Sequence, residues 1–242
     1  MKKIKITMIT AGLVGISVTT AQAQSQFDGA YGQLGIGYQN VSPSVSNVTV
    51  SGSAGGATLT NFPLSSSVGN SNDFTGTATL GYNFGLTKDF LLGIGAEYSP
   101  LASGNSNISA NYGPDANGAW YRASTTFKIE NSYNIFLSPA FAIDKDKLVY
   151  AKIGYTGANA KTANQSVNLH GYSLGLGYKQ IISGGWYGFG EVNYASYGNQ
   201  NLSTNYNSVV TVGGTTYNVP TTAKATVSAN TMNAIVGVGY KF

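Results

Sequence analysis

The chain contains no cysteine, only one histidine (His170) and few charged residues, which make up 9% of its 242 residues. Without cysteine there is neither a disulfide nor a thiolate metal centre. So little charge does not suit a soluble domain, whose surface is normally rich in lysine and glutamate. No unbroken apolar stretch approaches the roughly 20 residues that a membrane-spanning helix requires, so the sequence excludes helical spans.

The amino terminus has the layout of an export signal. Three lysines within the first five residues precede an apolar stretch over 6–18, and Ala21-Gln22-Ala23 supplies the small-x-small pattern of a cleavage site. We therefore predict a signal peptide over 1–23 and a single domain over 24–242. Removing these three lysines from the 13 basic residues leaves 10 against 9 acidic ones. The mature chain is thus nearly neutral, and we expect no nucleic-acid partner.

The rest of the sequence alternates between apolar and polar residues, which is typical of β-strands. From Met232 to Phe242 every second residue is apolar, and a period of two places these side chains on one face of a strand. The same alternation predicts eight strands, over 30–39, 73–84, 89–99, 123–143, 147–157, 169–180, 186–197 and 226–242.

The connections between these strands alternate between short and long. Residues 85–88, 144–146 and 183–185 are rich in turn formers. The four other connections are long and polar, and they lie near 40–72, 100–122, 158–168 and 198–225. Within the last of them, residues 207–219 predict a hairpin that turns at Gly213-Gly214. Its arms are too polar to meet lipid, so we expect it to project from the molecule.

Aromatic residues recur at the strand ends and predict two girdles. An aromatic ring that is apolar with a polar tip suits a membrane interface. The alternative is that tyrosine is simply common in strands, but its regular placement favours girdles. The expected members at one interface are Tyr38, Tyr98, Tyr155 and Tyr194, and at the other Tyr82, Phe141, Tyr178 and Tyr240.

A Gly-x-Gly pattern recurs at residues 35/37, 93/95, 175/177 and 237/239. It does not match a phosphate-binding loop, because it does not connect a strand to a helix. We expect these glycines to face a crowded interior, since an eight-stranded barrel has room inside only for side chains.

The same parity predicts a charged interior. Glu97, Lys128, Glu130, Lys152 and Glu191 fall on the inner face of their strands. On a lipid face each would cost roughly 2–4 kcal/mol near the membrane centre. We therefore predict one lumenal network of these five residues that plugs the interior, with a narrow gated pore as the alternative.

The seventh strand leaves two arrangements open. If Tyr194 faces outward, Gly188 and Gly190 do so too, and Tyr187 and Phe189 point inward. A β-bulge near Gly190 would instead turn Phe189 outward.

A search for catalytic residues yields one weak set, His170, Ser173 and Glu191. Lipid hydrolases and acyltransferases use such groups, but His170 and Ser173 lie on opposite faces of one strand. No pattern of metal ligands occurs in the sequence. We predict no catalytic residue, metal or cofactor.

Together, the export signal, the eight segments, the alternating connections and the ending Gly237-Val-Gly-Tyr-Lys-Phe242 resemble the small outer-membrane barrels, which include the OmpA transmembrane domain, OmpX and the opacity-type surface antigens. The resemblance implies an all-β, eight-stranded antiparallel up-and-down transmembrane β-barrel in the bacterial outer membrane, with short periplasmic turns and long extracellular loops. It also implies lipid and lipopolysaccharide as surroundings. Val238, Tyr240 and Phe242 would form a C-terminal signal for the barrel assembly machinery.

We expect a non-enzymatic surface protein whose loops contact the envelope or the environment. The alternatives are a narrow porin-like channel for ions or small solutes, a lipid-modifying enzyme and a soluble periplasmic barrel. The soluble barrel would have to wet ten outward residues, which are Leu34, Ile36, Leu80, Ile94, Ile135, Leu137, Ile153, Leu174, Leu176 and Val236.

Overall fold

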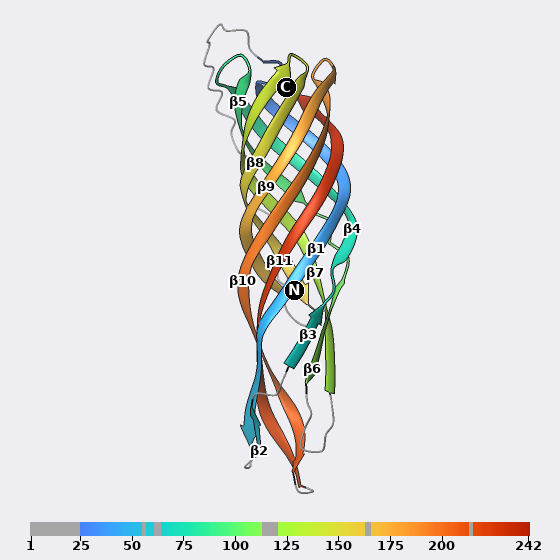
Figure 1. Cartoon of the computed structure of the whole chain (residues 1–242), viewed down its shortest axis with the longest axis vertical. Helices are drawn as coiled ribbons and strands as arrows, with labels where there is room; N and C mark the ends of the chain where they lie inside the picture. Colours follow the sequence, from blue (N-terminus) through green and yellow to red (C-terminus); the bar gives the residue numbers. More distant parts are fainter. Residues whose placement is uncertain (1–24, 55–56, 61–63, 113–120, 163–165, 213–214) are drawn as a thin grey trace, which may run out of the picture.

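The computed structural model shows a chain built from β-strands (Figure 1). Among the described residues there is no helix long and apolar enough to cross a membrane. The predicted signal peptide lies outside the described part of the chain. The structure describes residues 25–242 except 55–56, 61–63, 113–120, 163–165 and 213–214.

Eight strands close into a barrel, which confirms the predicted fold class. Neighbouring strands run antiparallel, and the first pairs with the last from Tyr31↔Lys241 onward. The strands of the ring are β1 (Gly29–Ala54), β4 (Ser71–Gly85), β5 (Phe90–Ser99), β7 (Tyr121–Asp144), β8 (Lys147–Thr162), β9 (Ser166–Ser183), β10 (Trp186–Val212) and β11 (Thr215–Lys241).

Three tight connections lie at one end of the barrel, which we call the turn end. They join β4 to β5, β7 to β8 and β9 to β10, as the sequence predicts. The opposite end, which we call the extension end, continues into long twisted ribbons (Figure 1).

The connections predicted to be long loops consist largely of strand. β1, β10 and β11 continue far beyond their predicted ends, and β2 (Ala57–Thr60) pairs with β1. β6 (Ser106–Tyr112) lies between β7 and β3 (Leu64–Val68). The sequence search missed these extensions because it required one apolar face. Threonine and valine favour strands in any setting where the backbone is paired.

The predicted hairpin over 207–219 is confirmed as the outer part of this extension. β10 and β11 stay paired from Asn207↔Pro220 to Val212↔Thr215. The predicted turning residues, Gly213 and Gly214, lie outside the described residues.

The apolar parity of the wall faces outward. All ten residues expected there are between 47% and 73% exposed. A continuous apolar band of this kind around a closed barrel is the surface that lipid covers. It argues against a soluble barrel, because monomeric soluble proteins rarely expose apolar patches larger than a few hundred Å².

The interior is crowded, as the Gly-x-Gly pattern predicts. A Cβ atom added at any of those eight glycines would come closer than 3.0 Å to an atom of another strand.

The structure also decides which side chains of β10 face the lumen. Tyr187 and Phe189 are 1% and 6% exposed and point inward. The pairing with β9 is regular from Tyr187 to Tyr197, so there is no bulge at Gly190.

Candidate functional site

A three-charge cluster crosses the middle of the lumen. Lys152 of β8 is 2% exposed, and its Nζ lies 2.9 Å from Glu97 Oε2 on β5 and 3.1 Å from Glu191 Oε1 on β10. Each carboxylate has a further donor: Thr79 Oγ1 donates to Glu97 at 3.2 Å, and Tyr150 Oη donates to Glu191 at 2.8 Å. The ammonium therefore links three strands, and the two carboxylates compensate its positive charge.

A second lumenal cation lies nearer the turn end, and the sequence analysis missed it. Lys179 of β9 is 4% exposed. Its Nζ lies 3.8 Å from the ring centroid of Tyr31 and 5.0 Å from those of Tyr150 and Tyr187. These distances are typical of cation–π contacts. Lys179 lies on the same face of β9 as the inward Ser173. The alternation that predicts an inward Lys152 therefore also predicts an inward Lys179.

The remaining two members of the predicted network, Lys128 and Glu130, lie outside the lumen. Asn131 has a φ of 52°, and the β7–β8 register shifts between Glu130 and Tyr133. The extra residue of such a β-bulge inverts the parity of the strand beyond it. Lys128 and Glu130 therefore face outward, so the prediction of one five-residue network is wrong.

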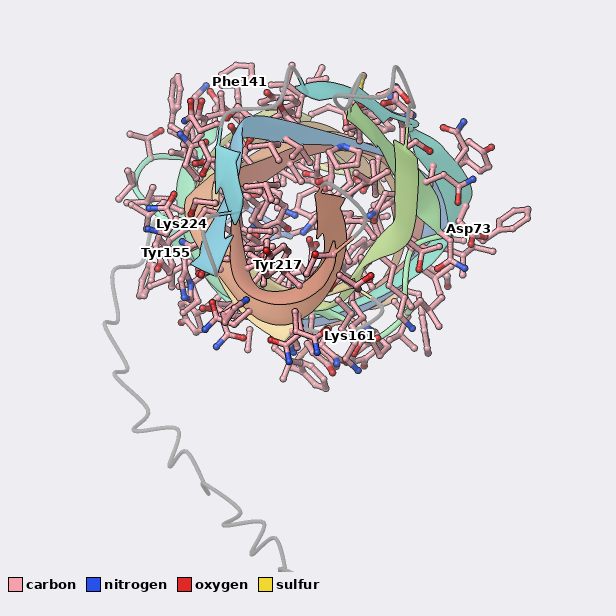
Figure 2. The ribbon with its side chains drawn as sticks, turned by 90° about the horizontal axis from the view of Figure 1, so that it is seen from below. Asp73, Phe141, Tyr155, Lys161, Tyr217 and Lys224 are labelled. Atoms are coloured by element: carbon pink, nitrogen blue, oxygen red, sulfur yellow. The ribbon has the colours of Figure 1, made fainter. Side chains whose placement is uncertain are left out.

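Outside the wall, these two residues join Lys161 of β8, which the sequence analysis did not single out. Glu130 pairs with Lys161, and its Oε2 lies 3.3 Å from Lys128 Nζ. The bulge also turns Phe127 and Ile129 inward, where both are buried. Figure 2, seen from the extension end, shows Lys161 on the outside of the wall.

The lumen is filled on both sides of the three-charge cluster. Towards the extension end, a polar cavity of about 40 Å³ has room for only a few water molecules. Beyond it, an apolar cluster includes the buried side chains of Val41, Phe127, Ile129, Leu169 and Tyr197. Buried apolar side chains therefore occupy the lumen on the extension side of this cavity.

The eight predicted girdle residues lie on the outer surface of the wall. Tyr38, Tyr98, Tyr155 and Tyr194, near the extension end, are between 40% and 54% exposed. Near the turn end, Phe141 and Tyr240 are 41% and 38% exposed, and Tyr82 and Tyr178 are half-buried. Tyr155 and Phe141 project outward in Figure 2. Further exposed rings on the described wall, outside the predicted girdles, include Phe74, Phe84, Phe90, Tyr133, Tyr172 and Trp186.

The three residues considered for catalysis are kept apart. His170 is exposed on the outer surface, where its ring stacks on Tyr155 with a centroid distance of 5.9 Å. Ser173 is buried and donates to Asn134 Oδ1 at 2.8 Å. Glu191 belongs to the three-charge cluster. The outward histidine and the inward serine cannot act on one substrate, as their parity predicts.

The carboxy-terminal residues lie on the outer face of β11 at the turn end. Val238, Tyr240 and Phe242 are 51%, 38% and 75% exposed. The Tyr240 ring packs between those of Trp186 and Phe242, at centroid distances of 5.2 and 5.3 Å. Phe242 N donates to Ala30 O at 2.9 Å and so continues the β1–β11 seam.

Comparison with known proteins finds likeness in structure and none in sequence. No protein-family model matches the chain, and no curated protein sequence matches it. The outer membrane protein OprG from Pseudomonas aeruginosa matches with a TM-score of 0.51 and 14% identity, over 91% of this chain and 99% of that chain. The chain has the fold of a small outer-membrane β-barrel.

Two further solved structures illustrate the range of barrels to which the chain is similar. The outer membrane protease OmpT from Escherichia coli matches with a TM-score of 0.45 and 11% identity, over 93% of this chain and 100% of that chain. Ail, the attachment invasion locus protein of Yersinia pestis, matches with a TM-score of 0.38 and 13% identity, over 88% of this chain and 99% of that chain.

Beyond the barrel at the extension end, the ring separates into two sheets, and one of them has a long open edge. One sheet follows the order β2–β1–β11–β10, and the other β3–β6–β7–β8–β9. The β9–β10 ladder ends at Gly171↔Tyr197. Among the described residues, 200–212 of β10 pair with β11 alone. Apart from Ser203, which has a further interaction, the other side of this stretch has no strand partner among the described residues and can offer its backbone N–H and C=O groups to an added strand.

Proposed function

We propose that the chain is a non-enzymatic protein of the bacterial outer membrane, exposed at the cell surface, which binds an extended polypeptide segment along the open edge of β10. The turn end then faces the periplasm and the extension end faces outward. The single observation that carries the proposal is the open edge over residues 200–212. A strand added there would gain main-chain hydrogen bonds without any change in the barrel.

The composition of this edge supports strand addition. Exposed edges are usually guarded by charged residues or proline, which prevent unwanted pairing. Residues 200–212 read QNLSTNYNSVVTV and contain neither. By contrast, residues 42–50 of β1, which pair only with β11 among the described residues, contain Pro43. Of these two described edges, that of β10 is the longer and lacks charged residues and proline.

The filled lumen supports a surface role over the alternative of a narrow channel. A conducting path would have to pass both the three-charge cluster and the apolar cluster at the extension end. The separation of His170 from Ser173 supports a non-enzymatic role.

The proposed surroundings follow from the same orientation. Lipopolysaccharide would meet the outward cluster of Lys128, Glu130 and Lys161, whose ammonium groups can contact phosphate. The assembly machinery would recognise Val238, Tyr240 and Phe242 during biogenesis.

Strand addition can be tested with a synthetic peptide of residues 200–212, because pairing of this kind depends mainly on the backbone. In nanodiscs, we expect the peptide to slow amide hydrogen exchange over 200–212 of the barrel, and to leave 42–50 unchanged. A peptide with proline at alternate positions should have no effect, since it cannot complete the ladder.

A matched pair of variants separates edge binding from general charge effects. Asn207→Lys places a charge on the open strand and should weaken binding of the peptide several-fold. Asn218→Lys places the same charge on β11, which already has β10 as its partner, and should bind like the wild type. If exchange over 200–212 is unaffected by the peptide, the proposed function is wrong.

A further inference from the structure

A short segment before β1 folds into the mouth of the barrel at the turn end. Its backbone forms a compact turn, in which Asp28 N donates to Ser25 O at 3.0 Å. Asn83 Nδ2 on β4 donates to Phe27 O at 2.8 Å. Gly29 then has a φ of 112°, a conformation open mainly to glycine, where the chain enters the wall.

This turn places Phe27 inside the lumen. Phe27 is 2% exposed, although it precedes the first strand. It packs in an apolar cluster with Leu91, Ala142, Leu148 and Tyr150. Its ring also meets that of Tyr187 edge-on, with a centroid distance of 6.5 Å. The apolar filling at this mouth thus includes a residue that is not part of the wall.

The residues behind Phe27 are those that surround the second lumenal cation. Tyr150 and Tyr187, which contact Phe27, also present their rings to Lys179 Nζ. Among the described residues, Lys179 forms no ion pair within 4.0 Å. The tyrosine rings are therefore the nearest described partners of its ammonium, and these cation–π contacts are stronger where water is excluded from the layer.

We propose that Phe27 is a stopper, an intramolecular plug that closes the periplasmic mouth and keeps water from the Lys179 layer. The segment 25–28 lies outside the strand ladders and is held by the hydrogen bond from Asn83, by the packing of the Phe27 ring and by a further interaction of Asp28, whereas the wall is held by continuous ladders. It can therefore leave the mouth without opening the barrel. The wall and the stopper are separate parts with separate stabilities.

The absence of native cysteine allows a direct test by thiol labelling. Ala142→Cys places a reporter in the Phe27 cluster, where the alanine is 7% exposed. We expect a water-soluble maleimide to label it slowly in the refolded barrel. Adding Phe27→Ala should speed labelling about tenfold or more, because reaction would no longer wait for a local opening.

Three controls isolate the stopper. Phe84→Ala removes a ring that is 49% exposed on the outer wall near the same end, and should leave labelling unchanged. Phe27→Leu keeps an apolar plug and should restore slow labelling. A second reporter, Ala160→Cys, lies in the cluster at the extension end and should stay slow in every variant.

For each variant, a difference in gel mobility between unheated and heated samples first shows that the barrel is folded. The labelling outcomes are then distinct. If Phe27→Ala leaves Ala142→Cys as slow as before, Phe27 does not close the mouth. If both reporters accelerate equally, the substitution has loosened the whole barrel and the stopper is refuted. Neither result depends on whether the open edge of β10 binds a peptide.

Discussion

Replacing Lys152 with methionine is expected to lower the free energy of unfolding by about 3–5 kcal/mol, the cost typical of breaking a buried ion pair. The reason is the position of its ammonium between Glu97 and Glu191, at 2.9 and 3.1 Å. Without it, two carboxylates remain buried near each other with no cation between them. The measurement is a urea titration of the barrel in detergent micelles. The folded fraction is followed on a gel, where a folded barrel migrates differently in unheated and heated samples.

Two controls show whether the lost charge causes this change. Lys147→Met, at the start of β8, removes the same group from an ion pair with Asp144 in which each side chain is 43% exposed, and should change stability by no more than about 0.5 kcal/mol. Combining Lys152→Met with Glu97→Gln and Glu191→Gln should recover part of the loss, because no uncompensated charge remains. A triple variant no more stable than Lys152→Met would contradict the electrostatic explanation.

Replacing Gly177 with valine is expected to destabilise the barrel by about 3 kcal/mol or to prevent refolding, at the upper end of the cost of overpacking. A Cβ at Gly177 would overlap the ring of Tyr150. That ring cannot easily move, because its hydroxyl donates to Glu191 and its face contacts Lys179. Refolding yield and urea midpoint both report the effect.

Gly188→Val is the matched control for this prediction. Gly188 lies on the outer parity of β10, and the nearest atom to an added Cβ is Ile182 Cδ1 at 3.6 Å. The same enlargement should therefore be tolerated there. Equal damage from both substitutions would mean that valine harms the strands in general, and that the crowded interior is not the cause.

The sequence predicts the barrel well wherever its wall is regular. Apolar residues such as Leu34 and Val236 have to meet lipid, so a period of two reports their direction directly. The three-charge cluster follows from the same rule, because Lys152, Glu97 and Glu191 all lie on uninterrupted parts of their strands.

The prediction failed where the backbone departs from this regularity. At Asn131, one extra residue inverts the parity, and nothing in the alternation of Lys128 and Glu130 marks the change. Asparagine tolerates a positive φ better than most residues, but asparagine is also common in this chain. The bulge is therefore visible only in the register of β7 against β8.

Features formed by packing between distant segments could also not be predicted from the sequence. Lys179 lies beside three tyrosines from three other strands, and Phe27 enters the lumen from outside the predicted strands. Their environments follow from closure of the ring, which fixes the tilt of the strands and the stagger of their register together. The extensions of β10 and β11 depend on mutual pairing, which local composition does not reveal.

The seam between β1 and β11 has a consequence for biogenesis. It joins Tyr31 to Lys241 and continues to Gly52↔Thr221, so it unites segments from the two ends of the domain. Contacts so remote in sequence form late and slowly. A chain whose synthesis stops early has no partner for its first strand and keeps a sticky edge. Closure of the ring therefore depends on its last strand, because a chain that ends before β11 leaves the facing edges of β1 and β10 without a partner.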